Sequence, residues 1–191
     1  MSQHTVSSQP LTLADLQNLM QESASLSLGK EAKEKVQRCR EYLDKKITVD
    51  AKPIYGINTG FGSLYNKHIP DEQLERLQEN LVKSHAVGMG PAIPDEIVRL
   101  MLFLKVQSLS YGYSGVQVET VNRLIDFFNN KVYPKVYEMG SLGASGDLAP
   151  LAHLSLPLIG LGEVRLEGRD HPAKEILDRF GWKPLHLKAK E

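Results

Sequence analysis

Apolar residues recur every three or four positions through most of the 191-residue sequence, and this spacing constrains the fold more than any other feature. Such a period places them along one face of an α-helix, whereas a half-buried strand would need strict alternation. Proline, aspartate and glycine mark several of the expected helix ends. The pattern predicts helices over residues 12–27, 30–46, 71–87, 94–110, 115–129, 148–160 and 172–180. The expected fold class is therefore mainly α.

One segment alternates in the manner of strands. In "EVRLEGRDH", residues 163–171, Val164 and Leu166 point to one side before a glycine turn, which is typical of a short β-hairpin. Two further stretches, residues 50–69 and 137–147, are less regular and rich in glycine. Because loops on a rigid scaffold often carry function, these two stretches are the first places to look for a site.

The charge balance excludes several classes of partner. The 23 basic and 23 acidic residues give a formal net charge of zero, so no basic surface of the kind that binds nucleic acid is expected. No apolar stretch reaches the ~18 residues that a membrane span needs. The opening "MSQHTVSSQP" also lacks the apolar core of a signal peptide. These features favour a cytoplasmic protein without a membrane or nucleic-acid partner.

The single cysteine, Cys39, excludes an internal disulfide. Ala32, Val36 and Leu43 share its helical face, so we expect Cys39 to be a core residue rather than a reactive thiol. No set of His, Cys, Asp and Glu residues has the spacing of metal ligands, and we therefore expect no metal site.

The segment "GSLGASGDLAPLAH", residues 140–153, surrounds Ser145 with small residues. Small residues let the backbone turn sharply or let another group come close. The plainest interpretation is a turn before a buried helix that Asp147 caps and that Pro157 later bends or ends. A second interpretation is a hydrolase nucleophile at Ser145. It is disfavoured because the nucleophile elbow needs a glycine where Asp147 stands.

A third interpretation makes the backbone itself the reagent. The amide nitrogen of Gly146 can attack the carbonyl carbon of Ala144 in a compressed turn, which the small side chains of this tripeptide permit. Loss of one water closes a five-membered imidazolone ring, and loss of a second water from Ser145 leaves an exocyclic methylene. The product is a strong electrophile that needs no external cofactor. It would lie at the N-terminus of a helix, where developing negative charge is stabilised.

A second glycine-rich loop, "YGINTGFGSLY", spans residues 55–65. Its glycine spacing fits neither the Rossmann nor the P-loop pattern, so phosphate binding is disfavoured. One alternative is a tight connection between helices. The other is a mobile loop that carries Tyr55 as a base, since a phenol becomes an effective base beside a positive group that favours its ionised form.

A histidine lies near the end of one of the predicted helices, residues 71–87. In "NLVKSHAVGMG", residues 80–90, His85 comes one turn after Leu81 and is followed by a flexible segment with two glycines. A lone histidine in this place is more often a capping or partly buried residue, but histidine is also a common catalytic type. Both alternatives stay open on the residue pattern alone.

Taken together, "YGINTGFG", "NLVKSHAVGMG" and "GSLGASGDLAPLAHLSLPLIGLGE" resemble the aromatic amino acid ammonia-lyases, most closely the members that act on histidine. The resemblance runs from about residue 10 to the last residue, and the Ala-Ser-Gly-Asp segment is highly specific to this family and its aminomutase relatives. It implies that Ala144, Ser145 and Gly146 form the family's methylidene-imidazolone group, without an external cofactor. It also implies that Tyr55 acts as a base or proton relay and that His85 lies on the substrate side.

The resemblance implies a reaction, the non-oxidative elimination of ammonia from L-histidine to give trans-urocanate. Ala86 after His85 favours histidine as the substrate, because tyrosine-selective members often have leucine there. The alternatives are a tyrosine or phenylalanine ammonia-lyase, an aromatic aminomutase, or an inactive fragment of such an enzyme. Family members are several hundred residues long and assemble as homotetramers. Residues 1–191 are therefore expected to be the N-terminal, electrophile-bearing domain of the ammonia-lyase fold, without its C-terminal helical bundle.

Overall fold

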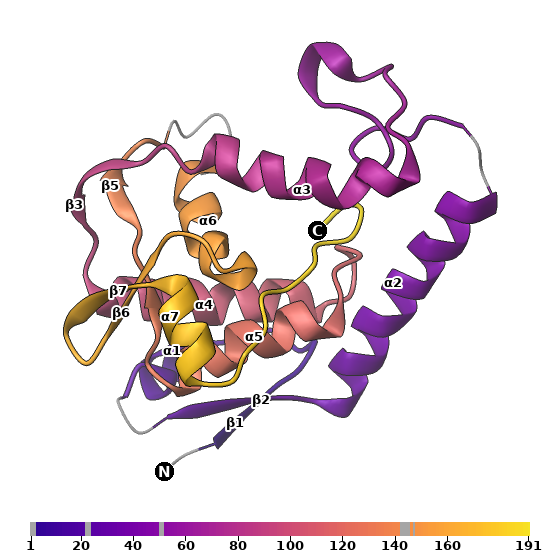
Figure 1. The fold of residues 1–191 in the computed structure, drawn as a ribbon. Helices are drawn as coiled ribbons and strands as arrows, with labels where there is room; N and C mark the ends of the chain where they lie inside the picture. Colours follow the sequence, from indigo (N-terminus) through magenta and orange to yellow (C-terminus); the bar gives the residue numbers. More distant parts are fainter. Residues whose placement is uncertain (1–2, 22–23, 50–51, 142–145, 147) are drawn as a thin grey trace.

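The computed structural model describes residues 3–21, 24–49, 52–141, 146 and 148–191. Helices dominate it, and the predicted mainly α class is confirmed (Figure 1). The α-helices are α1 (Leu13–Leu19), α2 (Lys30–Val49), α3 (Asp71–His85), α4 (Asp95–Ser110), α5 (Val118–Asn129), α6 (Leu148–Ser155) and α7 (Ala173–Arg179), and 3₁₀ turns cover η1 (Gly62–Leu64) and η3 (Leu156–Ile159). None of the helices in these ranges is long and apolar enough to cross a membrane.

Short strands connect distant parts of the chain. β1 (Gln3–Val6) pairs in parallel with β2 (Ser25–Leu28), and β3 (Met89–Ala92) pairs antiparallel with β5 (Tyr137–Met139). A third sheet has the order β4 (Tyr133–Pro134), β6 (Glu163–Leu166) and β7 (Arg169–Pro172). The predicted hairpin is confirmed as β6 and β7, whereas the other pairs were not predicted.

The prediction of one helix over residues 12–27 is wrong. The helix begins as predicted, since the Thr12 hydroxyl accepts a hydrogen bond of 3.2 Å from the backbone N–H of Asp15 and the Asp15 carboxylate accepts one in return. It ends at Leu19, because the alternating "SLSL" of β2 pairs with β1 instead. The Asn129 side chain fixes β2 from α5 by accepting from the backbone N–H of Leu26 at 2.7 Å.

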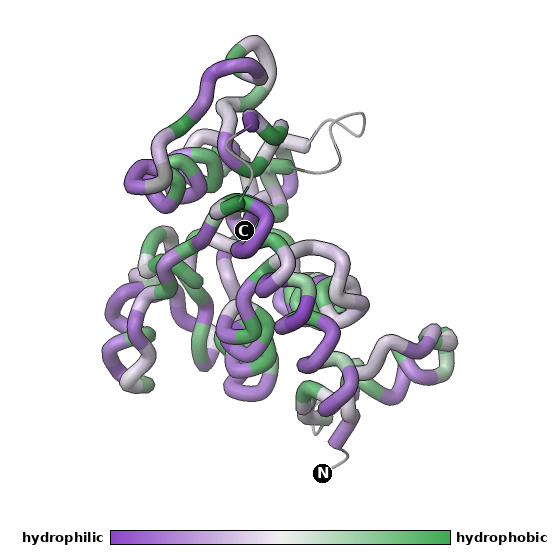
Figure 2. The backbone as a smooth tube through the Cα atoms, turned by 90° about the vertical axis from the view of Figure 1, so that its right-hand side faces the viewer, coloured by the Kyte–Doolittle hydropathy of each residue, from purple (hydrophilic) through white to green (hydrophobic). Residues whose placement is uncertain are grey.

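The core lies between α4 and α5, which run side by side in the middle of the molecule (Figure 1). Both helices bury large side chains completely: Phe103 on α4 packs against Phe128 on α5, and Phe127 on α5 packs against Trp182. Hydrophilic and hydrophobic residues alternate along the surrounding helices in Figure 2, as expected for helices that each bury one face. This core carries the elements that position the candidate site.

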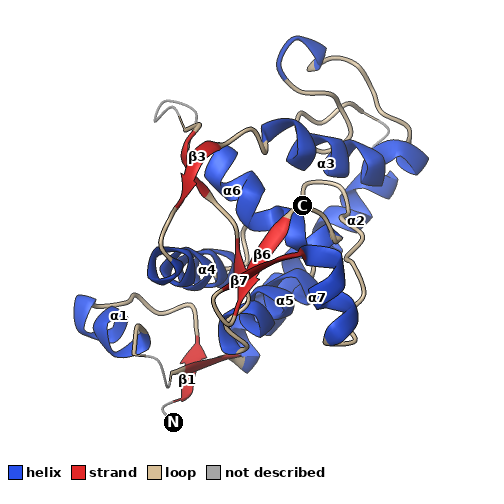
Figure 3. Cartoon of the chain, turned by 60° about the vertical axis from the view of Figure 1, so that its left-hand side comes forward, coloured by secondary structure: helices blue, strands red, loops and turns tan. Residues whose placement is uncertain are grey.

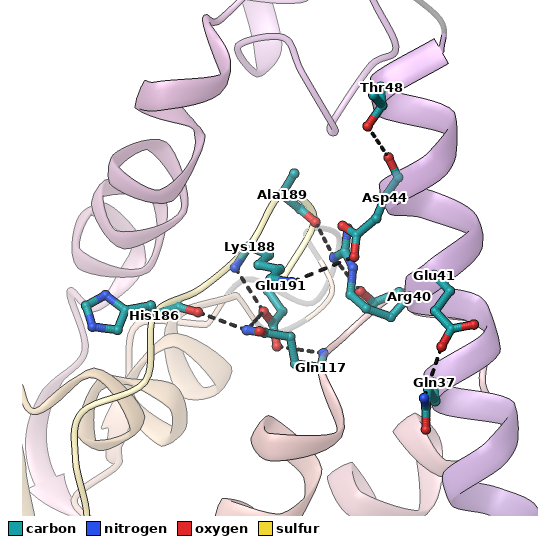
Figure 4. Close-up of polar contacts among 11 residues, drawn as sticks. Gln37, Arg40, Glu41, Asp44, Thr48, Gln117, His186, Lys188, Ala189 and Glu191 are labelled. Atoms are coloured by element: carbon teal, nitrogen blue, oxygen red, sulfur yellow. Dashed lines mark hydrogen bonds and ion pairs between the residues drawn. The ribbon is translucent and has the colours of Figure 1, made fainter.

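Cys39 is partly exposed, so its predicted place in the core is wrong. Arg40 takes the buried place on that face of α2, with 6% of its surface exposed. Its guanidinium donates to the carbonyl oxygens of Gly115 at 2.7 Å and Ala189 at 2.9 Å and pairs with Asp44 at 2.6 Å (Figure 4). These partners compensate the cost of burying the charge. Helical periodicity alone predicts an apolar residue on the buried face and could not predict Arg40 there.

The last residues of the chain pack back onto α2 and α5. The Glu191 carboxylate accepts hydrogen bonds from the backbone N–H and the side-chain amide of Gln117, at 2.9 and 2.6 Å, and from the backbone N–H of Lys188 (Figure 4). Because Gln117 directly precedes α5, this carboxylate satisfies one backbone donor at the start of that helix.

Candidate active site

The strand pair β3–β5 brings two of the predicted motifs together. β3 begins at Met89, shortly after α3 ends at His85, and β5 ends at Met139, directly before the glycine-rich segment. Met89 lies opposite Met139 and Ala92 opposite Tyr137. Figure 1 shows the two strands together near one end of α3, with α6 beside β5, and Figure 3 shows α6 beside β3. The segment from Gly140 to the start of α6 therefore begins and ends next to the C-terminal end of α3.

Most of the predicted electrophile-forming tripeptide lies outside the described residues. Ala144, Ser145 and the predicted cap Asp147 belong to that part, and Gly146 is the described member. Gly146 is exposed and has a φ of 80°, and no described residue has an atom within 4 Å of the position that a Cβ would take. Gly146 stands two residues before the start of α6. Its open surroundings are compatible with a residue whose nitrogen has to close a ring.

The helix that follows the segment behaves as predicted. α6 ends at Ser155, and the 3₁₀ turn η3 continues with Pro157 in its first turn. Proline cannot donate the backbone hydrogen bond that an α-helix needs there, so the prediction that Pro157 bends or ends the helix is confirmed.

His85 was predicted near the end of a helix over residues 71–87; it is the last residue of α3 and is half-buried. Its Nδ1 lies 2.7 Å from the carbonyl oxygen of Leu81 and 3.2 Å from the hydroxyl of Ser84. A carbonyl oxygen only accepts hydrogen bonds, so this contact assigns the proton to Nδ1. In the neutral ring, Nε2 then carries the lone pair and can accept a hydrogen bond from a ligand.

Tyr55 is not brought to the same place. It lies in the loop before α3 with 62% of its surface exposed, and its ring packs edge-on against Phe61 with the centroids 6.0 Å apart. Figures 1 and 3 place this loop beyond the N-terminal end of α3, whereas β3, β5 and α6 meet at the other end. The 15 residues of α3 span about 22 Å, so the helix separates the loop from His85.

Buried polar groups hold the Tyr55 loop in shape. The Asn58 side chain, 2% exposed, accepts from the backbone N–H of Ile54 at 2.6 Å and donates to the carbonyl oxygen of Lys52 at 3.2 Å. The backbone N–H of Ile69 donates to the carbonyl oxygen of Asn58 at 2.9 Å. Sequence reasoning missed Asn58, although an asparagine among glycines is a common signal of a loop that is ordered by its own side chains.

A second histidine, His153 on α6, belongs to the site region and was also missed. It is 9% exposed, and its Nε2 accepts a hydrogen bond of 2.9 Å from the backbone N–H of Gly88. Tyr137 of β5 packs against its ring, with the centroids 5.0 Å apart and the planes at 74°. Burial lowers the pKa of His153 below its ordinary value of 6.5, which favours the neutral ring that can accept this bond.

The lowered pKa of His153 predicts a pH-dependent stability. Below about pH 6.5 the unfolded chain binds a proton at this histidine before the folded chain does, so the free energy of unfolding falls as the pH falls. The loss ends once the pH is below the folded pKa. We expect His153→Gln to remove this contribution, which for one proton cannot exceed about 1.4 kcal/mol per pH unit.

Urea unfolding of both proteins over a series of pH values between about 7 and 5 measures the effect. The remaining histidines contribute equally to both curves, so the difference between the curves belongs to His153. Parallel curves would show that burial does not disfavour the charged ring.

Comparison with known proteins identifies the family that the chain matches. The profile of the aromatic amino acid lyase family matches residues 11–191. The chain is 49% identical over 193 aligned positions to a histidine ammonia-lyase of Legionella pneumophila, covering 100% of this chain and 38% of that protein.

Two solved structures have the same fold over this region. The histidine ammonia-lyase of Trypanosoma cruzi has 36% sequence identity and a TM-score of 0.88, and covers 100% of this chain, which spans 37% of that protein. The tyrosine aminomutase of Streptomyces globisporus has 33% identity and a TM-score of 0.89, over 97% of this chain and 35% of that protein. The chain therefore spans well under half the length of these relatives. Since the family profile matches nearly every residue, the chain belongs to the aromatic amino acid lyase family.

Proposed function

We propose that these residues form the electrophile-bearing portion of a carbon–nitrogen lyase that eliminates ammonia from L-histidine to give trans-urocanate. The observation that supports it most is the position of the Gly140–Leu148 connection, whose two ends lie beside the C-terminal end of α3, the helix that ends at His85 (Figure 1). The identity to a histidine ammonia-lyase over the whole chain supports the same substrate.

The electrophile is proposed to come from Ala144, Ser145 and Gly146. The nitrogen of Gly146 bonds to the carbonyl carbon of Ala144 and one water leaves, and Ser145 then loses its hydroxyl and its α-proton as a second water. The resulting methylidene-imidazolone group would supply an electron-accepting methylene to the substrate. The positive φ and open surroundings of Gly146 are compatible with this ring.

The side chains of the chain have separate tasks in the proposed reaction. Elimination removes one β-proton, breaks the bond between the α-carbon and the amine, and forms a carbon–carbon double bond. Tyr55 is proposed to take the proton as base or relay. His85 is proposed to bind the substrate imidazole, with its Nε2 accepting from the substrate N–H while Nδ1 keeps its bond to Leu81.

Intact-mass measurement of the purified chain is the primary test. Loss of two waters supports the electrophile, and its absence both from this chain and from the chain completed to the length of its relatives contradicts it. Turnover is then measured with the chain as it is and with the chain completed to the length of its relatives, by following trans-urocanate. A β-amino acid product would instead identify an aminomutase, which the likeness to the tyrosine aminomutase structure keeps as the second candidate.

Assembly, localisation and domain organisation are part of the same proposal. We place residues 1–191 in one electrophile-bearing domain of a cytoplasmic homotetramer, with a helical bundle supplied by further residues. Light scattering after size exclusion measures the assembly. A chain that loses two waters and turns over nothing by itself would agree with the inactive-fragment alternative.

His85→Phe is expected to change substrate choice. A site built to hydrogen-bond the substrate imidazole rejects substrates that lack such a group, because its own polar atom is then left unpaired. Removing the imidazole should therefore lower the ratio of kcat/KM for histidine to kcat/KM for phenylalanine by about 10-fold or more. Steady-state kinetics with both substrates measures the ratio.

His85→Asn is the matched variant. Its side-chain amide can replace Nδ1 in the bond to Leu81 but has no atom in the place of Nε2. A change in the ratio with both variants assigns the effect to Nε2. An unchanged ratio with both would make His85 a structural cap, and His68→Phe, at an exposed position, controls for the added ring.

A further inference from the structure

Gly88 is the point where three segments of the site region meet. It lies in the connection between α3 and β3, and its neighbours are Gly140 after β5 and His153 on α6. Its backbone N–H donates to His153 Nε2 at 2.9 Å. A Cβ on Gly140 would lie 2.8 Å from the Cα of Gly88, so these two backbones touch without a side chain between them. We refer to Gly88, Gly140 and His153 as the glycine–histidine clamp.

The clamp is tightly packed at both glycines. A Cβ on Gly88 would lie 3.0 Å from both Nε2 and Cδ2 of His153, and 3.3 Å from the carbonyl oxygen of Met139. Gly140 has a φ of 133°, which residues with a side chain rarely adopt. The ring of Tyr137 also packs edge-on against the imidazole. The orientation of His153 is therefore determined by packing and by one directed hydrogen bond.

The clamp fixes both ends of one stretch of chain. Gly140 immediately precedes residues 141–147, and α6, which carries His153, immediately follows them. Both ends are tied to the same residue, Gly88, one through backbone contact and the other through the imidazole. The clamp therefore holds Gly140 and α6, the described neighbours of this segment, against one residue.

We propose that His153 is a positioning residue for ring closure between Ala144 and Gly146. This inference rests on the proposed function. Ring closure needs the nitrogen of Gly146 close to the carbonyl carbon of Ala144, and holding two reacting groups in position accelerates their reaction strongly. His153 acts through Gly88 and the ends of the segment, and its neutral Nε2 is the atom that the role requires.

The test follows ring formation in His153→Leu, His153→Gln and His153→Asn. The Gln side chain can place its carbonyl oxygen where Nε2 lies and accept from Gly88, whereas the Asn side chain carries the same amide but is one methylene too short. Full chains are synthesised in vitro, and the loss of two waters is followed by intact mass over time. We expect His153→Leu and His153→Asn to slow the loss by about 10-fold, the effect of one hydrogen bond of ordinary strength, and His153→Gln to restore it within about threefold.

Each outcome has one meaning. If the unsubstituted chain, alone and completed to the length of its relatives, never loses two waters, the proposed function fails and this inference fails with it. If it loses them and all three variants do so at the same rate, this inference alone is wrong. The rate of water loss is measured only on the protease-resistant, folded fraction of each variant. If His153 had a purely structural role, the substitutions would lower the unfolding midpoint and leave this rate unchanged.

A glycine pair provides a second route if the histidine variants do not fold. Gly140→Ala places a methyl group against Gly88 at a φ of 133°, whereas Gly168→Ala also meets a positive φ, 74°, but in open space at the β6–β7 turn. Slower loss of water in the first variant and normal loss in the second supports the clamp. Equal rates in both overturn it.

Discussion

Ser145→Ala is expected to abolish the elimination of ammonia while leaving the protein folded. The proposed electrophile takes its methylene carbon from the side chain of Ser145, and alanine has no hydroxyl to lose as water. The fall in kcat should exceed about 10⁴-fold, beyond the range of a single acid–base group. Urocanate formation measures the activity, and intact mass should show that the loss of the second water no longer occurs.

Two further variants make this result specific. Ser145→Cys can still form the methylene by losing hydrogen sulfide, so partial activity is expected. Ser141→Ala removes a hydroxyl from the same segment outside the tripeptide and should leave the loss of two waters intact. Near-normal turnover of Ser145→Ala would show that the electrophile hypothesis is wrong, whatever the fold of the protein.

Sequence reasoning succeeded for helices that bury one face along their whole length. The starts of α3 and α4 were predicted from the Pro-Asp pairs at positions 70–71 and 94–95, and both helices begin at the aspartate. These signals are local, because proline is tolerated at the start of a helix and fits poorly inside it. The end of α1 and the strand β2 could not be predicted in this way, since β2 exists through its pairing with β1, more than twenty residues away.

The site residues also differ in whether a local pattern or a distant contact makes them recognisable. The tripeptide and His85 stand in recognisable local patterns, and the structure places the described ends of their segments together. The importance of His153 depends on Gly88, which is 65 positions away in the chain, so nothing next to His153 in the sequence indicates it. A tightly packed glycine is a signal only when its neighbours in space are known.

The position of Tyr55 in the fold could not be predicted from its motif. "YGINTGFG" identified the residue, but its loop lies beyond the opposite end of α3 from His85 (Figure 1). A catalytic Tyr55 therefore has to reach an electrophile by movement of its loop or in a second copy of the chain. Its exposure and its ring contact with Phe61 keep the hydroxyl available for such a role.

Tyr55→Phe is expected to lower kcat by about 10²-fold or more, the usual scale for a lost acid–base group. Phenylalanine keeps the ring that packs edge-on against Phe61, so the loop should retain its shape and the free energy of unfolding should be unchanged. Tyr65→Phe, at a similarly exposed tyrosine of the same loop, is the matched control and should keep kcat. Because the ring closes without a side-chain base in the proposed scheme, Tyr55→Phe should still lose two waters, which separates its role from that of Ser145. A higher KM with an unchanged kcat would instead make Tyr55 a binding residue, since such a change removes interactions that substrate and transition state share.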